Sequence, residues 1–213
     1  MKEDNVKKFW DNCSPQFAHL KMDGHLKSFS YVSSFWEQEF ICKTDFRNKI
    51  VLDYGIGAGF LGEYLFAKYK LKYYYGVDIS DRSLNEAKKR LHNNRNKTLI
   101  DTAQFYEKFE KQVDIIVCQA CIQHFPSIDH LNAFLEKINN LKAQEIILQI
   151  AFSPKTRFAK NHYDTIEDVV RSCYTNLEYI EPYLYNYQSK SVGPVGARGM
   201  GKDYQYLIFK SKH

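Results

Sequence analysis

A short apolar run followed by three alternating glycines constrains this sequence more than any other feature. The run covers residues 50–54 (Ile-Val-Leu-Asp-Tyr), and Gly55, Gly57 and Gly59 follow it. Apolar and β-branched residues favour a buried strand, and glycines permit the positive φ angles of a tight turn. Helical spacing of apolar residues then begins and continues to residue 70. The segment therefore predicts a strand, a tight loop and a helix, which together open an α/β fold.

Strand-like and helix-like segments continue to alternate up to about residue 150. Further strands are expected at 73–78, 98–101, 113–118 and 145–150, and the clearest helix between them at 129–141. Another helix is expected to begin after a Ser80 cap and to run to about Asn93. This alternation implies right-handed crossovers and a mostly parallel sheet with helices on both faces.

The two ends of the chain differ from this middle part. Residues 177–188 and 203–209 are predicted to be two strands joined by a glycine-rich loop, which indicates an antiparallel hairpin closing the sheet. Residues 1–48 indicate a helical extension, with Val6, Phe9 and Trp10 on one helical face and a second helical stretch at 34–40. We therefore expect residues 1–48 to be a helical cap of the same domain as residues 49–213.

Composition and charge narrow the setting and the partners. The N-terminal residues lack the apolar run of a signal peptide, and no apolar stretch is long enough to span a membrane. The five cysteines are an odd number without framework spacing, which suits a reducing compartment. The net charge of +5 is spread along the chain rather than gathered into one stripe. We expect a cytoplasmic protein, monomeric or homodimeric, without a membrane or nucleic acid as partner.

The spacing of the glycines bears on the ligand of the loop. The dinucleotide fingerprint has a third glycine at the position that Phe60 occupies here, and Phe60 would crowd a helix start that receives a pyrophosphate. No Gly-Lys-Ser/Thr follows, so the pattern of a phosphate-binding P-loop is also missing. The loop favours a ligand without a phosphate.

The loop and the next strand together resemble the class I methyltransferases that use S-adenosylmethionine. Their first motif is an acidic residue followed by G-x-G-x-G, matched here by Asp53 and the three glycines. Their second motif is an acidic residue that ends the second strand, matched by Asp78. The resemblance covers residues 49–150 and the tail only in outline. It implies a Rossmann-like, doubly wound, seven-stranded sheet, a methyltransferase activity and S-adenosylmethionine as the cofactor.

The resemblance also implies roles for individual residues on the cofactor side. The carboxylate of Asp78 would accept hydrogen bonds from both ribose hydroxyls, and Ile79 would lie against the adenine. Asp101 or Thr102 would meet the adenine edge, with a plain turn as the alternative. Asp53 would order the loop or reach the methionyl ammonium through water.

Asp78 also has a structural alternative. It could cap the next helix, although Ser80 suits that position better.

The fourth motif of small-molecule methyltransferases is resembled by residues 118–126. Gln119 would contact the methionyl part of the cofactor, and His124 is a candidate general base, with a structural hydrogen bond to the backbone as the alternative. The segment departs from the Asn/Asp-Pro-Pro-Tyr/Phe signature of nucleobase amine methyltransferases. Cys118 and Cys121 have zinc-like spacing but no second close pair, so we expect no metal.

Three residues near the C-terminus are candidates for binding the methyl acceptor. His162 and Tyr163 follow the fifth expected strand, and Arg198 lies in the glycine-rich loop, where it could meet an anionic group. At the other end of the chain, Trp10 could cover the cofactor, or could pack against the sheet.

These patterns lead to one leading function and several alternatives. We expect O-methylation of a hydroxyl on a small molecule, such as a sugar, a surface-glycan precursor or another metabolite. The Lys-, Asn- and Tyr-rich composition is typical of an AT-rich bacterial genome. The alternatives are an RNA-modifying methyltransferase and a catalytically silent protein that binds S-adenosylmethionine; Phe60 weakens the case for an NAD-dependent oxidoreductase.

Overall fold

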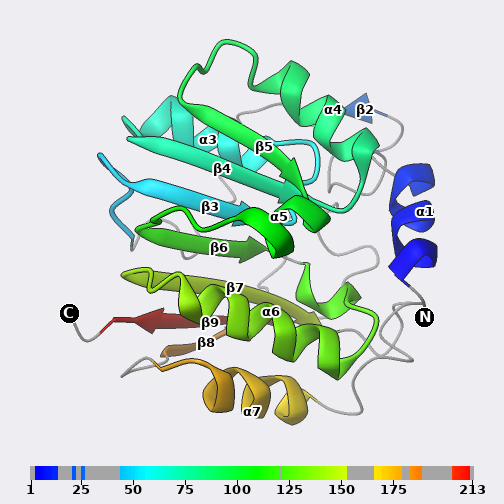
Figure 1. Cartoon of the computed structure of the whole chain (residues 1–213), viewed down its shortest axis with the longest axis vertical. Coiled ribbons are helices and arrows are strands. Elements are labelled where there is room, and N and C mark those ends of the chain that lie inside the picture. Colours follow the sequence, from blue (N-terminus) through cyan, green and yellow to red (C-terminus); the bar gives the residue numbers. More distant parts are fainter. Residues whose placement is uncertain are drawn as a thin grey trace. The chain divides into compact units, whose positions relative to one another are not determined.

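The computed structural model describes residues 3–13, 21–22, 25–26, 44–119, 121–152, 166–178, 183–188 and 203–211. The chain divides into two compact units, one of residues 7–109 and one of residues 1–6 together with 110–213. Figure 1 labels the elements of both.

Three parallel strands form the sheet of the unit 7–109. They are β3 (Ile50–Tyr54), β4 (Tyr73–Asp78) and β5 (Lys97–Asp101), with β4 in the middle. The helices are α3 (Phe60–Lys68), α4 (Asp81–Arg90) and α5 (Thr102–Lys108). The predicted strands and the helices after the first two of them are confirmed, whereas α5 was not predicted.

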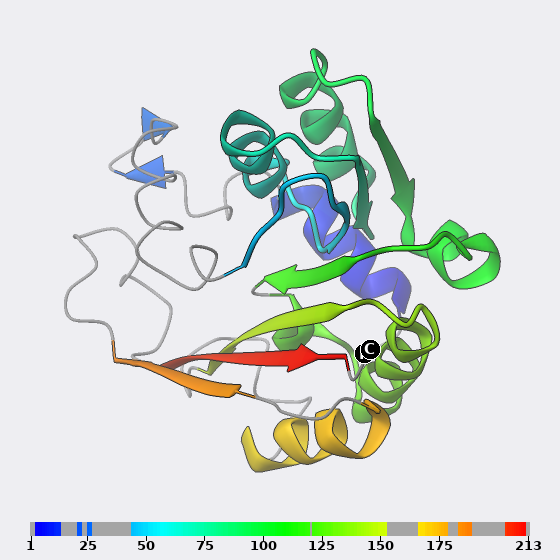
Figure 2. The ribbon, with the colours of Figure 1, turned by 90° about the vertical axis from the view of Figure 1, so that its left-hand side faces the viewer.

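Alternating side chains of these strands pack against helices on both faces. Toward α3, a Cβ added to Gly62 would lie only 2.8 Å from the Tyr74 hydroxyl oxygen. Toward α5, the ring of Tyr54 lies 5.2 Å from that of Phe105, centroid to centroid. In Figure 2, α3 and α5 lie on opposite sides of these strands. The helices of this unit therefore cover both faces of its sheet, as the alternation in the sequence predicts.

The other unit contains parallel and antiparallel pairs. Strand β6 (Ile115–Gln119) is parallel to β7 (Glu145–Phe152), and β9 (Asp203–Lys210) is antiparallel both to β7 and to β8 (Tyr183–Gln188). The predicted antiparallel C-terminal hairpin is confirmed. The chain thus has a Rossmann-like α/β fold, mostly parallel, with an antiparallel C-terminal strand.

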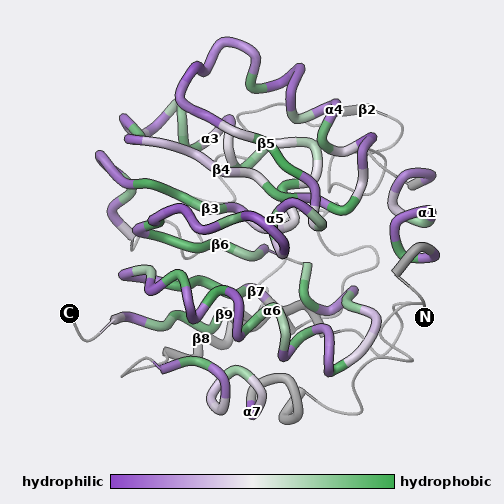
Figure 3. Tube along the Cα trace, in the orientation of Figure 1, coloured by the Kyte–Doolittle hydropathy of each residue, from purple (hydrophilic) through white to green (hydrophobic). Residues whose placement is uncertain are grey.

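Helices and a buried strand complete this unit. The helical elements are η2 (Ile122–His124), α6 (Ile128–Asn140) and α7 (Ile166–Asn176). Strand β6 is hydrophobic along most of its length, shown green in Figure 3, and its side chains from Ile115 to Cys118 are buried. Strands buried on both faces read as continuous apolar runs, and this strand follows that rule.

One predicted strand is wrong in its extent. Residues 177–188 were expected to form a strand, but among the described residues the strand is Tyr183–Gln188, and the buried Leu177 directly follows α7. Apolar residues at 166, 169, 170, 173 and 177 follow the i, i+3, i+4 spacing of an amphipathic helix. This spacing indicates a helix, but the apolar residues that follow, at 183–188, favoured the prediction of a strand.

The N-terminal region combines a confirmed helix with an unexpected pair of strands. Helix α1 (Glu3–Cys13) carries Val6, Phe9 and Trp10, as predicted. Strands β1 (Lys21–Met22) and β2 (His25–Leu26) form a small antiparallel pair. The predicted helical stretch at 34–40 lies outside the described residues.

Helices long and apolar enough for a bilayer are not found in the part of the chain that the structure describes.

Candidate cofactor site

The loop after β3 needs its glycines for conformational reasons. Gly55, Gly57 and Gly59 have φ angles of +83°, +54° and +82°, a region that side chains with a Cβ rarely adopt. A Cβ added to Gly59 would also lie 3.1 Å from the Cα of Ala87. Gly59 is the residue before the first turn of α3. The G-x-G-x-G spacing is thus a requirement of the turn itself.

Backbone hydrogen bonds attach the loop to the end of β4. The N–H groups of Gly55 and Ile56 both donate to the carbonyl oxygen of Val77, at 2.8 and 3.0 Å. A Cβ added to Gly76 would meet the side-chain ends of Ile56 and Leu99, so a larger residue at this position of β4 would require those two side chains to shift. The first half of the loop is therefore fixed over the second strand of the unit.

The carboxylate of Asp78 ties the loop to the start of α4. Oδ2 accepts from the N–H of Gly57 at 2.8 Å, and Oδ1 accepts from the N–H of Ser80 at 2.9 Å. Ser80 caps α4, since its Oγ accepts from the N–H of Ser83 at 3.1 Å; this confirms the predicted cap. A carboxylate has about four lone-pair sites, so both oxygens keep the capacity for a further hydrogen bond.

The environment of Asp78 raises its pKa to about 6. Burial is the main cause, hydrogen bonds from Ser80 and Gly57 partly offset it, and the charge of Asp11 adds to the rise. The carboxylate is nevertheless mostly ionised at neutral pH, which an acceptor of two hydroxyl hydrogen bonds requires.

Asp53 is more deeply buried than we would expect of a residue that contacts a ligand at the surface of the loop. Its side chain is buried, and its Oδ2 accepts from the Tyr74 hydroxyl at 2.6 Å, so the pair joins β3 to β4. Burial raises the pKa of Asp53 to about 7, the hydrogen bond from Tyr74 lowers it in part, and the charge of Asp78 raises it further. Whether Asp53 also orders the loop or reaches the cofactor stays a prediction.

Asp101 and Thr102 lie at a helix start rather than in a plain turn. Asp101 is paired with Asp78 across the ends of β5 and β4, and its Oδ1 accepts from the N–H of Gln104 at 2.7 Å as the cap of α5. Thr102 is the first residue of that helix. The register thus places the two aspartates on neighbouring strand ends, while contact with an adenine stays a prediction.

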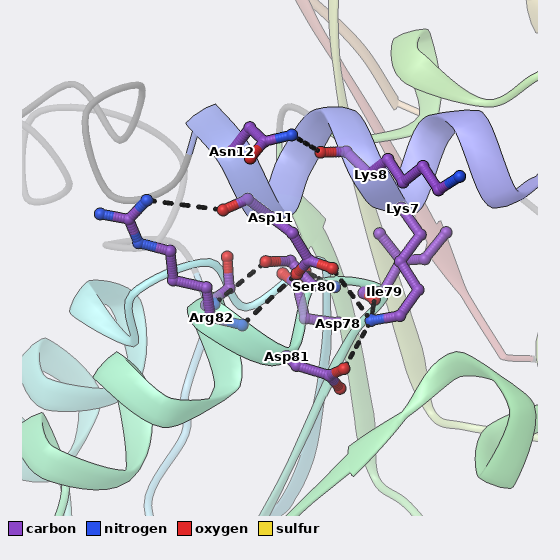
Figure 4. Close-up of polar contacts among 10 residues, drawn as sticks. Lys7, Lys8, Asp11, Asn12, Asp78, Ile79, Ser80, Asp81 and Arg82 are labelled. Atoms are coloured by element: carbon purple, nitrogen blue, oxygen red, sulfur yellow. Dashed lines mark hydrogen bonds and ion pairs between the residues drawn. The ribbon is translucent and has the colours of Figure 1, made fainter.

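A charged cluster that the sequence reading missed joins α1 to the residues around Asp78 (Figure 4). Lys7 Nζ donates to the carbonyl oxygen of Ile79 at 3.1 Å and pairs with Asp81 at 2.7 Å and Asp11 at 3.2 Å. Although burial alone would lower the pKa of Lys7, its hydrogen bonds to the two carboxylates raise it. Unlike charges on α1 and α4 were the signal that could have found this cluster.

Asp11 is the second residue through which α1 reaches α4. Its Oδ1 lies 3.5 Å from the N–H of Arg82, and hydrogen bonds from Ser80 and Lys7 lower its pKa despite partial burial. On the same helix, Trp10 packs edge-to-face on Phe9, with 5.2 Å between the ring centroids. The structure thus holds α1 at the motif containing Ile79, while cofactor contact by Trp10 stays a prediction.

Gln119 and His124 belong to the other unit. Gln119 is the last residue of β6, in register with Gln149 of β7, and is half-buried. His124 ends the short helix η2, where its backbone N–H donates to the carbonyl oxygen of Cys121 at 2.9 Å. The next residue, Phe125, packs on His130 with 4.9 Å between ring centroids. Residues 121–125 therefore form a short helical turn before α6.

The remaining candidates are not placed. His162, Tyr163 and Arg198 lie outside the described residues. Within the described ranges, histidine, cysteine and acidic side chains form no group of three suited to a metal ion.

The residues of the unit 7–109 fit S-adenosylmethionine by the chemistry that they offer. The cofactor carries ribose hydroxyls and no phosphate, and Asp78 supplies a buried acceptor with free lone-pair capacity beside the loop. A Cβ added to Gly57 would meet nothing within 4 Å, so the loop borders open space there.

Comparison with known proteins gives a consistent picture. A family model described as "Methyltransferase domain" matches residues 51–144. No curated protein sequence matches the chain.

Solved structures show the same fold at low sequence identity. The chain is similar to magnesium protoporphyrin IX methyltransferase from Synechocystis PCC 6803 with bound S-adenosylhomocysteine (15% identity, 99% of this chain and 100% of that chain covered, TM-score 0.63). It is also similar to phosphoethanolamine N-methyltransferase 2 from Haemonchus contortus in complex with S-adenosyl-L-methionine (13% identity, 98% and 60% covered, TM-score 0.64). A third similar structure is the small RNA methyltransferase HEN1 (21% identity, 87% and 25% covered, TM-score 0.59).

Proposed function

Because the chain is a class I, S-adenosylmethionine-dependent methyltransferase, we propose that it methylates a hydroxyl group of a small molecule. One observation supports the cofactor part of this proposal. The buried carboxylate of Asp78 accepts hydrogen bonds from the backbone N–H groups of Gly57, in the glycine loop, and Ser80. That arrangement offers carboxylate oxygens that can accept hydrogen bonds from hydroxyl groups.

Each cofactor contact is part of the proposal. Asp78 binds the ribose hydroxyls, and Ile79 covers one face of the adenine. Asp101 or Thr102 meets the adenine edge, and the backbone carbonyl of Gln119 meets the methionyl part. The remaining contributors are the loop residues Asp53, Gly55, Gly57 and Gly59, and Trp10 as a cover from α1.

The chemistry requires positioning first and proton removal second. When bound, S-adenosylmethionine supplies a methyl group on a positively charged sulfur that leaves as a neutral thioether. The protein holds the acceptor oxygen in line with that carbon, at roughly 3 Å. An imidazole nitrogen of His124 would accept the proton that the acceptor hydroxyl loses. His162, Tyr163 and Arg198 are the proposed acceptor contacts.

Two sequence features favour a small acceptor over a nucleobase. The excess of 30 basic over 25 acidic residues is spread along the chain, whereas nucleic-acid binding usually needs a concentrated patch. The segment Gln119–Ile122 also lacks the Asn/Asp-Pro-Pro-Tyr/Phe signature. The names of the two small-molecule methyltransferases among the similar structures support the same choice.

Organisation and setting complete the proposal. Residues 1–48 form a cap that belongs to the same domain as residues 49–213. The protein acts in the cytoplasm as a monomer or homodimer.

A panel of acceptors tests the proposed reaction. Purified protein with S-adenosylmethionine is incubated with sugars, nucleotide sugars, hydroxy acids, phenols, amines and total RNA, and S-adenosylhomocysteine release is measured by mass spectrometry. A hydroxyl compound that gains 14 mass units supports O-methylation; turnover of amines alone contradicts it. Tight cofactor binding with no turnover on any acceptor would instead identify a catalytically silent member.

RNA is the second candidate acceptor, because HEN1 is among the similar structures. An RNA enzyme should be retained on RNA with an affinity that falls steeply as salt rises. Retention that disappears at physiological salt excludes this candidate.

A further inference from the structure

Arg90, the last residue of α4, touches the glycine loop and α3 at three points. Its Nε donates to the carbonyl oxygen of Ala58 at 2.9 Å, and its Nη1 pairs with Oε2 of Glu63 at 2.8 Å. Its guanidinium carbon lies 3.4 Å from the centroid of the Phe60 ring. Phe60 occupies the position at which the dinucleotide fingerprint has its third glycine. The side chain of Arg90 is 26% exposed, so these contacts are partly shielded from water.

The bond from Arg90 is the side-chain contact that holds the peptide between Ala58 and Gly59. Ala58 is buried and stands between Gly57 and Gly59, both at positive φ. Glycine occupies many other φ and ψ values at little cost, so the peptide plane between two glycines is weakly specified by the chain itself. In the structure the N–H of Gly59 donates to the carbonyl oxygen of Ile56 at 3.0 Å, and Arg90 binds the carbonyl oxygen of Ala58. Without Arg90 a buried carbonyl would lose its charged partner.

Helix α4 is attached to the loop at both of its ends. At its start, Asp78 binds the N–H of Gly57 and the N–H of Ser80, the cap residue. At its end, Arg90 binds the carbonyl of Ala58, one residue further along the loop. A capped helix of ten residues is a stiff element. The helix therefore fixes the loop relative to the Asp78 carboxylate.

A neighbouring ion pair on the same helix shows what an ordinary surface contact looks like. Lys89 pairs with Glu86 at 2.8 Å, three residues away, and the two side chains are 73% and 37% exposed. Exposed pairs of this kind contribute little. Arg90 differs because its partners lie about 30 residues away in sequence and include a backbone carbonyl and an aromatic face. Only a planar guanidinium can make all three contacts at once.

We propose that Arg90 is a positioning residue for the cofactor, which sets cofactor affinity by holding the peptide between Gly57 and Gly59 in its binding conformation. Arg90 acts through the loop and does not itself contact the ligand. A loop held in this way loses less conformational freedom when the ligand binds, so removing the clamp weakens binding. This role rests on cofactor binding by the loop and is independent of the acceptor.

Calorimetry with S-adenosylhomocysteine tests this role. Arg90→Met keeps much of the aliphatic volume but removes the charge, the donors and the planar group, and Lys89→Met is the matched control. We expect Arg90→Met to raise the Kd by about tenfold, since a hydrogen bond to a charged group typically contributes more than that factor. Lys89→Met should stay within about twofold of wild type. Arg90→Lys should fall between wild type and Arg90→Met, because one ammonium cannot make every contact.

Amide hydrogen exchange separates positioning from general destabilisation. In the ligand-free protein, Arg90→Met should speed exchange at Gly57 and Gly59 while the amides of β3 exchange as in wild type. Equal acceleration in β3 would show a merely structural role and overturn the proposal, as would a Kd equal to that of Lys89→Met. If the wild-type protein binds no S-adenosylhomocysteine, the cofactor assignment itself fails, which is a separate and recognisable outcome.

Discussion

The glycine loop with Asp78 and the segment Gln119–His124 are both candidate site regions, but the sequence constrains them very differently. In the loop, three positive φ angles favour glycine, and the two backbone hydrogen bonds of Asp78 require a side chain with two acceptor oxygens. In the second region, the backbone N–H of His124 donates to the carbonyl oxygen of Cys121, and the ring of Phe125 packs on that of His130; other residues could also make contacts of these two kinds. The backbone conformation therefore restricts which residues can occupy the proposed cofactor side. On the proposed acceptor side, only the chemistry of the side chains restricts the residues.

The largest expected effect is a change in kcat, and it concerns the proposed acceptor side. As the proposed base, His124→Gln should lower kcat for a hydroxyl acceptor by about 10²- to 10⁴-fold, with the Kd for S-adenosylhomocysteine unchanged. His130→Gln, on α6, is the matched control and should leave kcat near wild type. A His124 variant with normal turnover would assign that imidazole a structural part only.

The next test concerns the buried carboxylate of β3. Because the folded pKa of Asp53 is raised to about 7, its protonated form is favoured by folding. The stability from this group is therefore complete below about pH 4 and is lost as pH rises through 7. We expect Asp53→Asn to remove a decline on the order of 3 kcal/mol between pH 4 and 8, measured by urea unfolding.

Asp45 is the control for that measurement. Its ion pair with Arg47 lowers its pKa to about 2, so Asp45→Asn should leave the slope between pH 4 and 8 unchanged. A wild-type stability that rises over this range would contradict the assignment to Asp53.

Cofactor binding by the loop can be tested by replacing Asp78, whose carboxylate binds the N–H of Gly57. Asp78→Asn places an amide N–H₂ against the N–H of Gly57 or Ser80, so one donor loses its acceptor, and the ribose loses a charged partner. The Kd for S-adenosylhomocysteine should rise by about 10- to 150-fold, the equivalent of about 1.4 to 3 kcal/mol. Asp81→Asn, at an exposed position on the same helix start, serves as the comparison. An unchanged Kd in Asp78→Asn would remove the basis of the cofactor site.

The smallest expected effect belongs to the cluster between α1 and α4. Lys7→Met removes pairs whose side chains are 38% exposed on Lys7 and 69% on Asp81, so about 1 kcal/mol or less is at stake. We expect a Kd for S-adenosylhomocysteine two- to fivefold weaker, with the difference fading at high salt. Lys8→Met on the same helix is the control; an equal effect there would show that overall charge is responsible.

Much of the unit 7–109 was predictable because local rules and tertiary contacts agree there. Strands β3 and β4, the Ser80 cap and the glycine turn each follow from residue type and spacing. Helix α5 was missed because seven residues give too little periodicity to recognise. Helix α7 was missed although its spacing is regular, because the following apolar residues also fit a strand.

Contacts between distant residues could not be read from the sequence in either unit. Arg90 and Ala58 are 32 positions apart, and Lys7 and Ile79 are 72 apart. In the sequence alone, Arg90 and Lys7 are each indistinguishable from an ordinary charged residue on a helix surface. Phe60 was noted in the sequence as an argument against a pyrophosphate site, but its contact with Arg90 became visible only in the folded chain.

The order of the strands β6, β7, β9 and β8 has a consequence for biosynthesis. Strand β9 lies between β7 and β8, although it is made after both. While the chain is still emerging from the ribosome, β7 has an open edge and β8 has no neighbour to pair with among these strands. Unpaired strand edges invite association with other chains. The nascent protein should therefore depend most on chaperones in the interval before residues 203–210 leave the exit tunnel.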